Sequence, residues 1–184
     1  MHSKSTTTLF IGIIIIITSI NCTISAQQSG INNDFSFGIQ VSQYQQDFGI
    51  GITVTSPYFA NKKIALRARG NLMFHEHLQN QETTWSPYLN ATFGVAGKTG
   101  WVGDAVRLYG EGGGTGLFPS DEFSSVSFEL GGYGLFGFEF YMNPASNYFI
   151  EIGAVGTGAK ADNVTDEPIY SNGLTISTGF RLHL

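Results

Sequence analysis

The chain has 184 residues, of which 42% are hydrophobic and 12% charged, and its formal net charge at pH 7 is −5. This length suits one domain, and no low-complexity linker, long charge run or change in composition marks a boundary after the N-terminal segment. The acidic balance offers no basic surface, so we expect no nucleic-acid partner. The single cysteine, Cys22, excludes a fold held together by disulfide bonds within the chain.

The N-terminal segment resembles a secretory signal peptide. A short basic lead with His2 and Lys4 precedes an apolar run over residues 9–20, and Ala26 supplies a small residue at the end of a cleavage site. The apolar run is shorter than the about 20 residues that a membrane-spanning helix needs. We therefore expect residues 1–26 to be a cleaved signal peptide.

Two other fates of this segment stay open. The apolar run could remain as an anchor, or Cys22 could carry a lipid at the mature N-terminus. Asn21 is a poor match to the small residue that lipoprotein processing prefers before the cysteine. With cleavage after Ala26, residues 27–184 form the mature domain.

The rest of the chain alternates apolar side chains with small or polar ones, and this period of two predicts β-strands. In the last segment Leu174, Phe180 and Leu182 share one face, while Arg181 and His183 lie on the other. We expect eight segments of about ten residues, the length that a tilted membrane-spanning strand requires. They are placed near 34–44, 47–56, 63–75, 84–97, 105–117, 125–141, 147–159 and 173–184.

The charged residues separate into two groups along this pattern. The four lysines of the mature segment fall in expected connections, at Lys62, Lys63, Lys98 and Lys160. The polar faces of the segments carry four arginines and four glutamates: Arg67, Arg69, Arg107, Arg181, Glu111, Glu129, Glu139 and Glu151. Unpaired, each of these charges would cost several kcal/mol to bury, so we expect a balanced charge network in a closed lumen.

Several soluble architectures also use alternating strands. A lipocalin-like barrel, a jelly roll and a sandwich all turn their apolar faces inward. In these folds the arginines and glutamates would form ordinary surface salt bridges, which stabilise little. The position of the charges favours an all-β fold of another kind, an eight-stranded antiparallel up-and-down transmembrane β-barrel with apolar side chains toward lipid.

The mature chain resembles the small outer-membrane β-barrel proteins of Gram-negative bacteria, of the OmpA transmembrane-domain and OmpX type. The most specific element is the ending, in which Phe180, Leu182 and Leu184 resemble the signal that the barrel-assembly machinery recognises, with Leu in place of the usual final Phe. The resemblance implies a monomer in the cell outer membrane, with the lipids of that membrane and the assembly machinery as partners. It implies no cofactor.

The connections differ between the two ends of such a barrel. With both chain ends on the periplasmic side, four loops face outward and are acidic. Their carboxylates are Asp47, Glu76, Glu82, Asp121, Glu122, Asp162, Asp166 and Glu167. A calcium site at Asp162, Asp166 and Glu167 matches no calcium-loop spacing, so a solvated rim is the favoured interpretation. Aromatic girdles are expected at both interfaces, with Trp85 at the outer one and Tyr58 at the inner one.

A barrel of eight strands is just wide enough for its own side chains. Five tyrosines add bulk inside, at Tyr44, Tyr88, Tyr109, Tyr133 and Tyr141. We therefore expect a plugged lumen and a non-enzymatic structural or surface-interaction role, with an extracellular ligand as a possible partner. A narrow solute or ion pore is the alternative.

A lipid-modifying enzyme is a further alternative. It would need a serine, a histidine and an orienting group near the outer rim. The chain offers His75 and His77 in the second outer loop, with Ser120, Asp121 and Ser124 in the third. A metal site at the two histidines lacks a third ligand at a telling spacing, so no metal is expected.

Glycines gather in two neighbouring segments. Gly112, Gly113, Gly114 and Gly116 are expected opposite Gly131, Gly132 and Gly134. The first interpretation is curvature in a narrow barrel, and the second is a thin wall against which a hydrocarbon chain or a loop lies.

Overall fold

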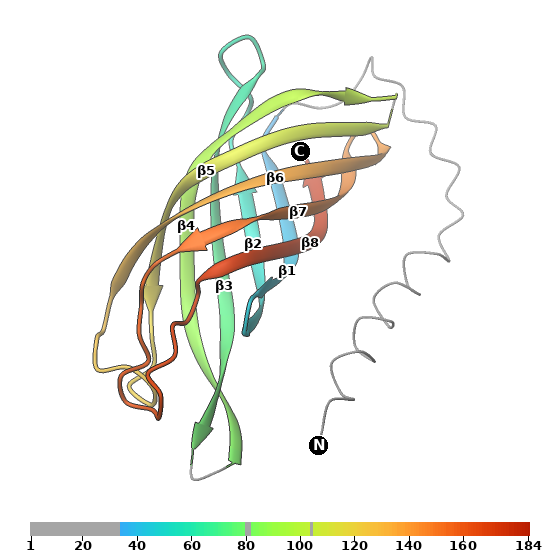
Figure 1. The fold of residues 1–184 in the computed structure, drawn as a ribbon. Coiled ribbons are helices and arrows are strands. Elements are labelled where there is room, and N and C mark those ends of the chain that lie inside the picture. Colours follow the sequence, from blue (N-terminus) through green and yellow to red (C-terminus); the bar gives the residue numbers. More distant parts are fainter. Residues whose placement is uncertain (1–33, 80–81, 104) are drawn as a thin grey trace.

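The computed structural model describes residues 34–79, 82–103 and 105–184, and eight antiparallel strands in it form a closed barrel in chain order (Figure 1). The expected signal peptide, residues 1–26, lies outside the described residues. No helix among the described residues has the length and apolar character needed to cross a membrane. The strands are β1 (Ser36–Tyr44), β2 (Asp47–Thr55), β3 (Ile64–Gln79), β4 (Glu82–Val102), β5 (Val106–Phe118), β6 (Glu129–Asn143), β7 (Ser146–Gly156) and β8 (Gly173–His183).

The barrel closes through β1, which pairs with β2 on one side and with β8 on the other. Ser36 lies opposite Thr55 in the first pair and opposite His183 in the second. Each strand therefore has two neighbours, and no row of backbone N–H and C=O groups is left at an edge. Closure of this kind is what allows β-strands to cross a hydrocarbon layer. The expected eight-stranded up-and-down barrel is confirmed.

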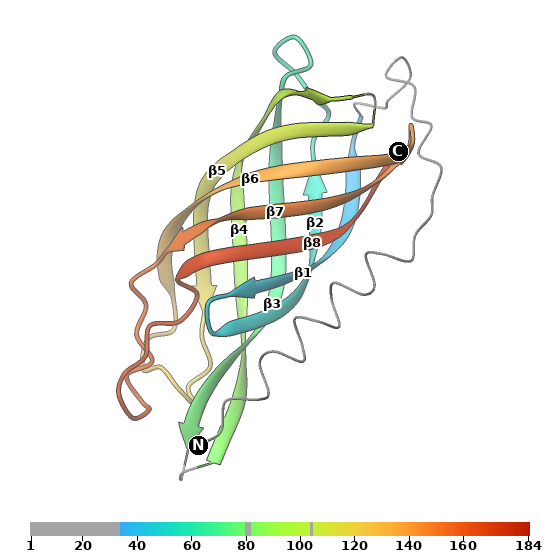
Figure 2. The same cartoon turned by 45° about the vertical axis from the view of Figure 1, so that its right-hand side comes forward.

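The two ends of the barrel differ, and we name them by their connections. The loop end carries the β1–β2, β3–β4, β5–β6 and β7–β8 connections, and the turn end carries the other three (Figures 1 and 2). The β3–β4 hairpin projects beyond its neighbours at the loop end, because pairing continues to Gln79 opposite Glu82. The 21 residues of β4 span about 70 Å at roughly 3.3 Å per residue. Both strands are longer than the sequence pattern indicated.

Apolar side chains point outward and charged ones inward. Phe93 on β4 and Leu130 on β6 are 60% and 68% exposed, whereas Arg67 on β3 and Glu139 on β6 are 1% and 0% exposed. A soluble barrel or sandwich has the opposite arrangement. The outward face is therefore a hydrophobic belt, which suits a membrane-spanning barrel, and the soluble alternatives are wrong.

Two expectations at the turn end are wrong. Lys98 lies within β4, which continues past a register shift between Lys98 and Gly100, and its ammonium sits 3.6 Å from the centre of the Tyr58 ring. Tyr58 is buried under Lys98 and Arg107, so it contributes no ring to an interfacial girdle. Trp85, expected at the other interface, is exposed, and so is Phe118.

The two glycine-rich segments pair as expected, with Gly112 opposite Gly134 and Gly114 opposite Gly132. A methyl group added at Gly112 would approach its nearest neighbour, the Tyr133 carbonyl oxygen, only to 3.5 Å. At Gly113, on the inner face, it would lie 2.1 Å from the Phe93 carbonyl oxygen. These glycine-rich segments therefore leave the outer face open at Gly112, whereas only glycine fits on the inner face at Gly113.

Candidate functional site

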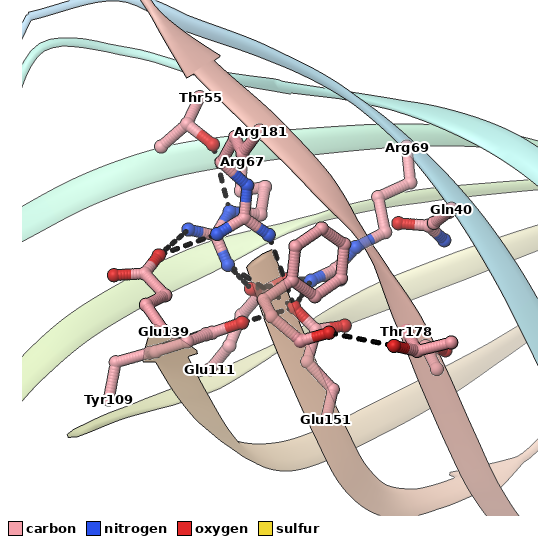
Figure 3. A network of polar contacts seen from close by, with 12 residues as sticks. Gln40, Thr55, Arg67, Arg69, Tyr109, Glu111, Glu139, Glu151, Thr178 and Arg181 are labelled. Carbon is pink, nitrogen blue, oxygen red and sulfur yellow. Dashed lines mark hydrogen bonds and ion pairs between the residues drawn. The ribbon is translucent and has the colours of Figure 1, made fainter. Parts of the chain in front are cut away.

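The centre of the lumen holds a network of seven charged side chains from five strands, and all of them except Arg107 are labelled in Figure 3. They are Arg67 and Arg69 on β3, Arg107 and Glu111 on β5, Glu139 on β6, Glu151 on β7 and Arg181 on β8. Their side chains are at most 4% exposed. All seven sit on the inner face because each strand sends alternate side chains inward. We call this group the ionic network.

Each carboxylate of the ionic network contacts two or more arginines. Glu111 accepts from Arg67 Nη1 at 2.8 Å and also accepts from Arg69. Glu139 accepts from Arg107 Nε and from Arg181 Nη1, both at 2.5 Å. Such shared, charge-assisted bonds offset the cost of removing both ions from water.

Glu151 links the two halves of the network. Its Oε1 atom accepts from Arg69 Nη2 at 2.9 Å and from Arg181 Nη2 at 3.4 Å, and Tyr109 donates to it as well. These contacts reach from β7 to β3, across the lumen. The network therefore bridges opposite walls.

Aromatic rings fill the space around the arginines. The Arg67 guanidinium lies 4.8 Å from the centre of the Tyr109 ring, and that of Arg181 lies 4.1 Å from the centre of Phe149. The Tyr109 ring lies over Gly137, where an added methyl group would come within 2.2 Å of it. Glycine on the inner face thus makes room for a large side chain on the neighbouring strand.

Seven of the eight expected lumen charges lie together, and Glu129 does not join them. Glu129 opens β6 at the loop end, opposite Leu117, and pairs with none of the four arginines. Ten residues separate it from Glu139 on one strand, a distance of about 33 Å. Glu129 is on the same side of its strand as Glu139, but it lies at the loop end of the barrel, far from the ionic network along the barrel axis.

Asp47 is the acidic group that was missed inside the barrel. It was expected in an outer loop, but it begins β2 and is buried on the inner face. Its Oδ1 lies 2.7 Å from His75 Nδ1, and its Oδ2 accepts from the Tyr88 hydroxyl at 2.7 Å and the Ser171 N–H at 2.5 Å. With three glutamates and Asp47 against four arginines, these buried charges balance formally. The predicted segments 47–56 and 63–75 already contained both residues, but their pairing depends on the register of β2 with β3.

A second group closes the loop end, and we call it the loop-end cluster. Its buried members are Tyr44, Met73, Tyr88, Leu117, Phe123, Val155, Ala159, Ala161 and Tyr170. Phe123 comes from the β5–β6 connection and Tyr170 from the β7–β8 connection, and their rings meet edge to face with centres 5.0 Å apart. Burial raises the pKa of the Tyr170 phenol to about 12, so this ring stays neutral.

Hydrogen bonds hold those two connections against each other. The Asn163 N–H donates to the Phe123 carbonyl at 3.1 Å, and the Ser125 N–H donates to Asp162 Oδ1 at 2.8 Å. The Ser125 hydroxyl also donates to Asp162, and these bonds hold the pKa of the Asp162 carboxyl below its usual range. The two connections therefore form one cover over the loop end.

The residues considered for an enzyme are not assembled as a catalytic set. His75 and His77 both lie on β3 and are buried under Phe123, rather than in an outer loop. The Ser124 hydroxyl donates to the Lys160 carbonyl at 3.3 Å. The Ser120 hydroxyl accepts from the Glu122 N–H at 3.3 Å. Among the described residues, neither serine hydroxyl bonds to a histidine.

The C-terminal strand presents its expected signal residues to the outside. Leu182 and Leu184 are exposed and Phe180 is half-buried on the outer face of β8. The Leu184 N–H donates to the Phe35 carbonyl at 2.9 Å, next to the last β1–β8 pair. The strand is thus paired along its length while its apolar side chains face the belt.

Two solved structures have the same architecture. The N-terminal β-barrel domain of OprF from Pseudomonas aeruginosa matches with a TM-score of 0.54 and 11% identity, over 82% of this chain and 97% of that one. The chain has the fold of a small outer-membrane β-barrel. The outer membrane protein OprG from Pseudomonas aeruginosa matches with a TM-score of 0.54 and 14% identity, over 85% of this chain and 98% of that one. No protein-family model and no curated protein sequence matches this barrel.

Proposed function

We propose that the protein is an outer-membrane β-barrel with a closed lumen and a structural or surface-interaction role. The observation that carries the proposal is the ionic network, whose contacts run across the barrel from β3 to β5 and β7, and from β7 on to β8. A lumen cavity beside Arg69, Tyr133 and Glu151 has a volume of only about 20 Å³, room for about one water molecule. Two closures in series, the ionic network and the loop-end cluster, oppose the passage of solutes.

The proposed orientation places the loop end outside the cell and the turn end in the periplasm. The loop end carries the long β3–β4 hairpin and the acidic connections, and short turns at the opposite end are typical of these barrels. At this rim Lys160 Nζ lies 3.7 Å from Glu167 Oε2. Both side chains are exposed, so this salt bridge contributes little to stability. An extracellular ligand would meet this acidic surface first.

The outward side chains of β8 support the proposed assembly route. Phe180, Leu182 and Leu184 form the proposed signal for the barrel-assembly machinery, and the belt is the surface for outer-membrane lipids. The barrel closes on itself through β1 and β8, so one chain completes the fold and we propose a monomer. We propose for it a role without enzymatic activity, cofactor or nucleic-acid partner.

Membrane extraction followed by gel migration tests the barrel itself. The protein extracted from membranes should migrate differently before and after boiling, because a folded barrel resists the detergent at room temperature. Identical migration in both samples would contradict a membrane-embedded barrel.

Reconstitution in planar bilayers tests the closed lumen. The heat-modifiable protein should give no steady conductance. A matched double variant, Glu111→Ser with Arg67→Ser, removes two large charged side chains of the ionic network from the lumen. It should therefore raise the conductance. Steady, large conductance from the unmodified protein would rule out the closed lumen, and small steady conductance would establish the narrow pore.

A further inference from the structure

A groove of about 910 Å³ lies on the outer face of the barrel. Its lining comes from six neighbouring strands, in the order β7, β8, β1, β2, β3 and β4 around the wall. Ile39, Ile52 and Gly70 lie level with one another in this wall, and both isoleucines are exposed. A methyl group added at Gly70 would meet no atom within 4 Å. The groove is therefore a hollow in the hydrophobic belt, with open space above Gly70.

The surface of the groove suits a hydrocarbon chain. None of the described residues that line it is charged. Gln40 and Asn71 contribute backbone only, since their side chains turn inward and Gln40 Nε2 donates to Asn71 Oδ1 at 2.8 Å. The Thr178 hydroxyl, on the outer face, donates to the Tyr148 hydroxyl. A lipid chain in this hollow touches apolar protein atoms on several sides, so it gains more dispersion contacts than on a flat wall.

The β2–β3 connection lies at the turn end of the same wall and is basic. Residues 56–63 include Lys62 and Lys63 and contain no aspartate or glutamate. Both lysines are exposed. Phe59 in the same connection is 49% exposed, as expected of an aromatic side chain at a membrane interface. This connection therefore offers positive charge to an anionic headgroup directly below the groove.

The distance from the lysines to the groove matches the depth of one leaflet. Gly70 follows Lys63 by seven residues, about 23 Å along β3. With a strand tilt of about 40°, this corresponds to a rise of about 18 Å. Half of the hydrocarbon core is about 15 Å thick. When Gly70 lies near the middle of the bilayer, the ammonium groups of Lys62 and Lys63 therefore reach the phosphates of the leaflet at the turn end.

We propose that the groove binds the acyl chains of one phospholipid of the inner leaflet, whose phosphate lies against Lys62 and Lys63. The inference rests on the proposed orientation, which puts the turn end in the periplasm. Charge complementarity and continuity with the lipid-facing belt favour this occupant. In a symmetric pair a second copy would present the same groove, and two facing hollows leave a void. Residues 27–33 contain one apolar side chain, that of Ile31, so this segment does not match the groove.

The first test measures lipid retention by native mass spectrometry of the full chain extracted from membranes, and heat-modifiable migration verifies the fold of each variant. The unmodified protein should retain one phospholipid per chain. Gly70→Leu fills the groove and should lower the affinity for phosphatidylglycerol about tenfold. Gly114→Leu is the matched control, because Gly114 also faces outward, on β5, and an added methyl group there has its nearest neighbour 3.9 Å away. It should leave the affinity unchanged.

The second test concerns the headgroup. The unmodified protein should retain dioleoylphosphatidylglycerol about tenfold better than dioleoylglycerol, which lacks the phosphate, and Lys62→Gln with Lys63→Gln should abolish that preference. A preference kept by this double variant would overturn the proposal, as would equal retention by Gly70→Leu and the unmodified protein. Stronger retention of lipopolysaccharide than of phospholipid would also overturn it. A dimer that Gly70→Leu dissociates would overturn it in favour of a second copy. All of these results are compatible with a heat-modifiable, closed barrel, so they are distinguishable from failure of the proposed function.

Discussion

The ionic network draws every side chain from a strand, whereas the loop-end cluster draws Phe123 and Tyr170 from connections. The network sits where each strand has two paired neighbours, so the backbone holds its arginines and glutamates at fixed distances. The cluster depends on two connections that are held together by a few hydrogen bonds. Buried ions need rigid positions because their attraction falls steeply with misplacement, whereas apolar rings tolerate small shifts.

This difference predicts two modes of failure. A change in the ionic network should destabilise the whole barrel, because uncompensated charge remains in a closed lumen. A change in the loop-end cluster should release the cover and leave the barrel closed below it.

The largest effect is expected for Glu139→Gln. The change leaves Arg107 and Arg181 without the carboxylate that each contacts at 2.5 Å, and should lower the free energy of unfolding by about 3 to 5 kcal/mol. This loss of free energy is measured by urea unfolding in lipid vesicles, with tryptophan fluorescence as the signal. Glu129→Gln is the control and should change stability by less than about 0.5 kcal/mol. Equal losses in the two variants would contradict the exclusion of Glu129 from the network.

Phe123→Ala should loosen the loop end by about 3 kcal/mol, since the ring packs against Tyr88 and Tyr170 with centres 5.9 and 5.0 Å away. Hydrogen exchange should speed up in the β5–β6 and β7–β8 connections, while the strands at the turn end keep their protection. Phe118→Ala removes an outward ring of similar size and is the control. Faster exchange throughout the barrel would show that the two closures are not independent.

Asp47→Asn should cost about 1 to 3 kcal/mol, because a carboxylate that accepts from Tyr88 and Ser171 is replaced by an amide with one acceptor oxygen. Urea unfolding measures the loss. Glu76→Gln, on the exposed outer face of β3, is the matched control. A neutral result for Asp47→Asn would show that the aspartate does not tie β2 to the cover.

The smallest effect is expected from acid. The pKa of Asp162 lies below its usual 3.8 because Ser125 donates to the carboxylate, so this contact is fully present at neutral pH. As the pH falls below 3.8 and through the lower pKa of the folded state, the carboxylate takes up a proton and the contact weakens. Proteolysis of the two connections by pepsin should increase in that range, and Asp162→Asn should show the increase already at higher pH. Unchanged cleavage in the variant would show that the contact between Ser125 and Asp162 does not hold the two connections together.

Much of the barrel could be predicted, because alternation along a strand is a local property. Leu174, Ile176 and Leu182 are every-second residues of the last segment, and they face outward in the structure. Arg67 and Arg69 face inward as predicted. The predicted segment ended at His75, so the continuation of β3 through His77 to Gln79 was missed, since polar residues there suggested a loop. Their alternation continued, and pairing with β4 kept them in the ladder.

The candidate site divides in the same way. The sequence identified which charged residues turn inward, but Glu129 and Asp47 were assigned wrongly because depth along the barrel is not a property of one strand. The stagger between strands sets that depth. The loop-end cluster was out of reach, because nothing local relates Phe123 to Tyr170.

By itself, the sequence determined a closed β-barrel with an apolar outside and a charged inside, because a period of two assigns each side chain to a face. The tertiary structure alone decided the partners. Arg69 and Glu151 are 82 residues apart, and their contact exists because closure of the barrel brings β3 and β7 across one narrow lumen. The same closure placed Asp47 beside His75, and the β5–β6 and β7–β8 connections fold over the end of the lumen above them. Packing in three dimensions, and not spacing in the chain, sets which buried groups meet.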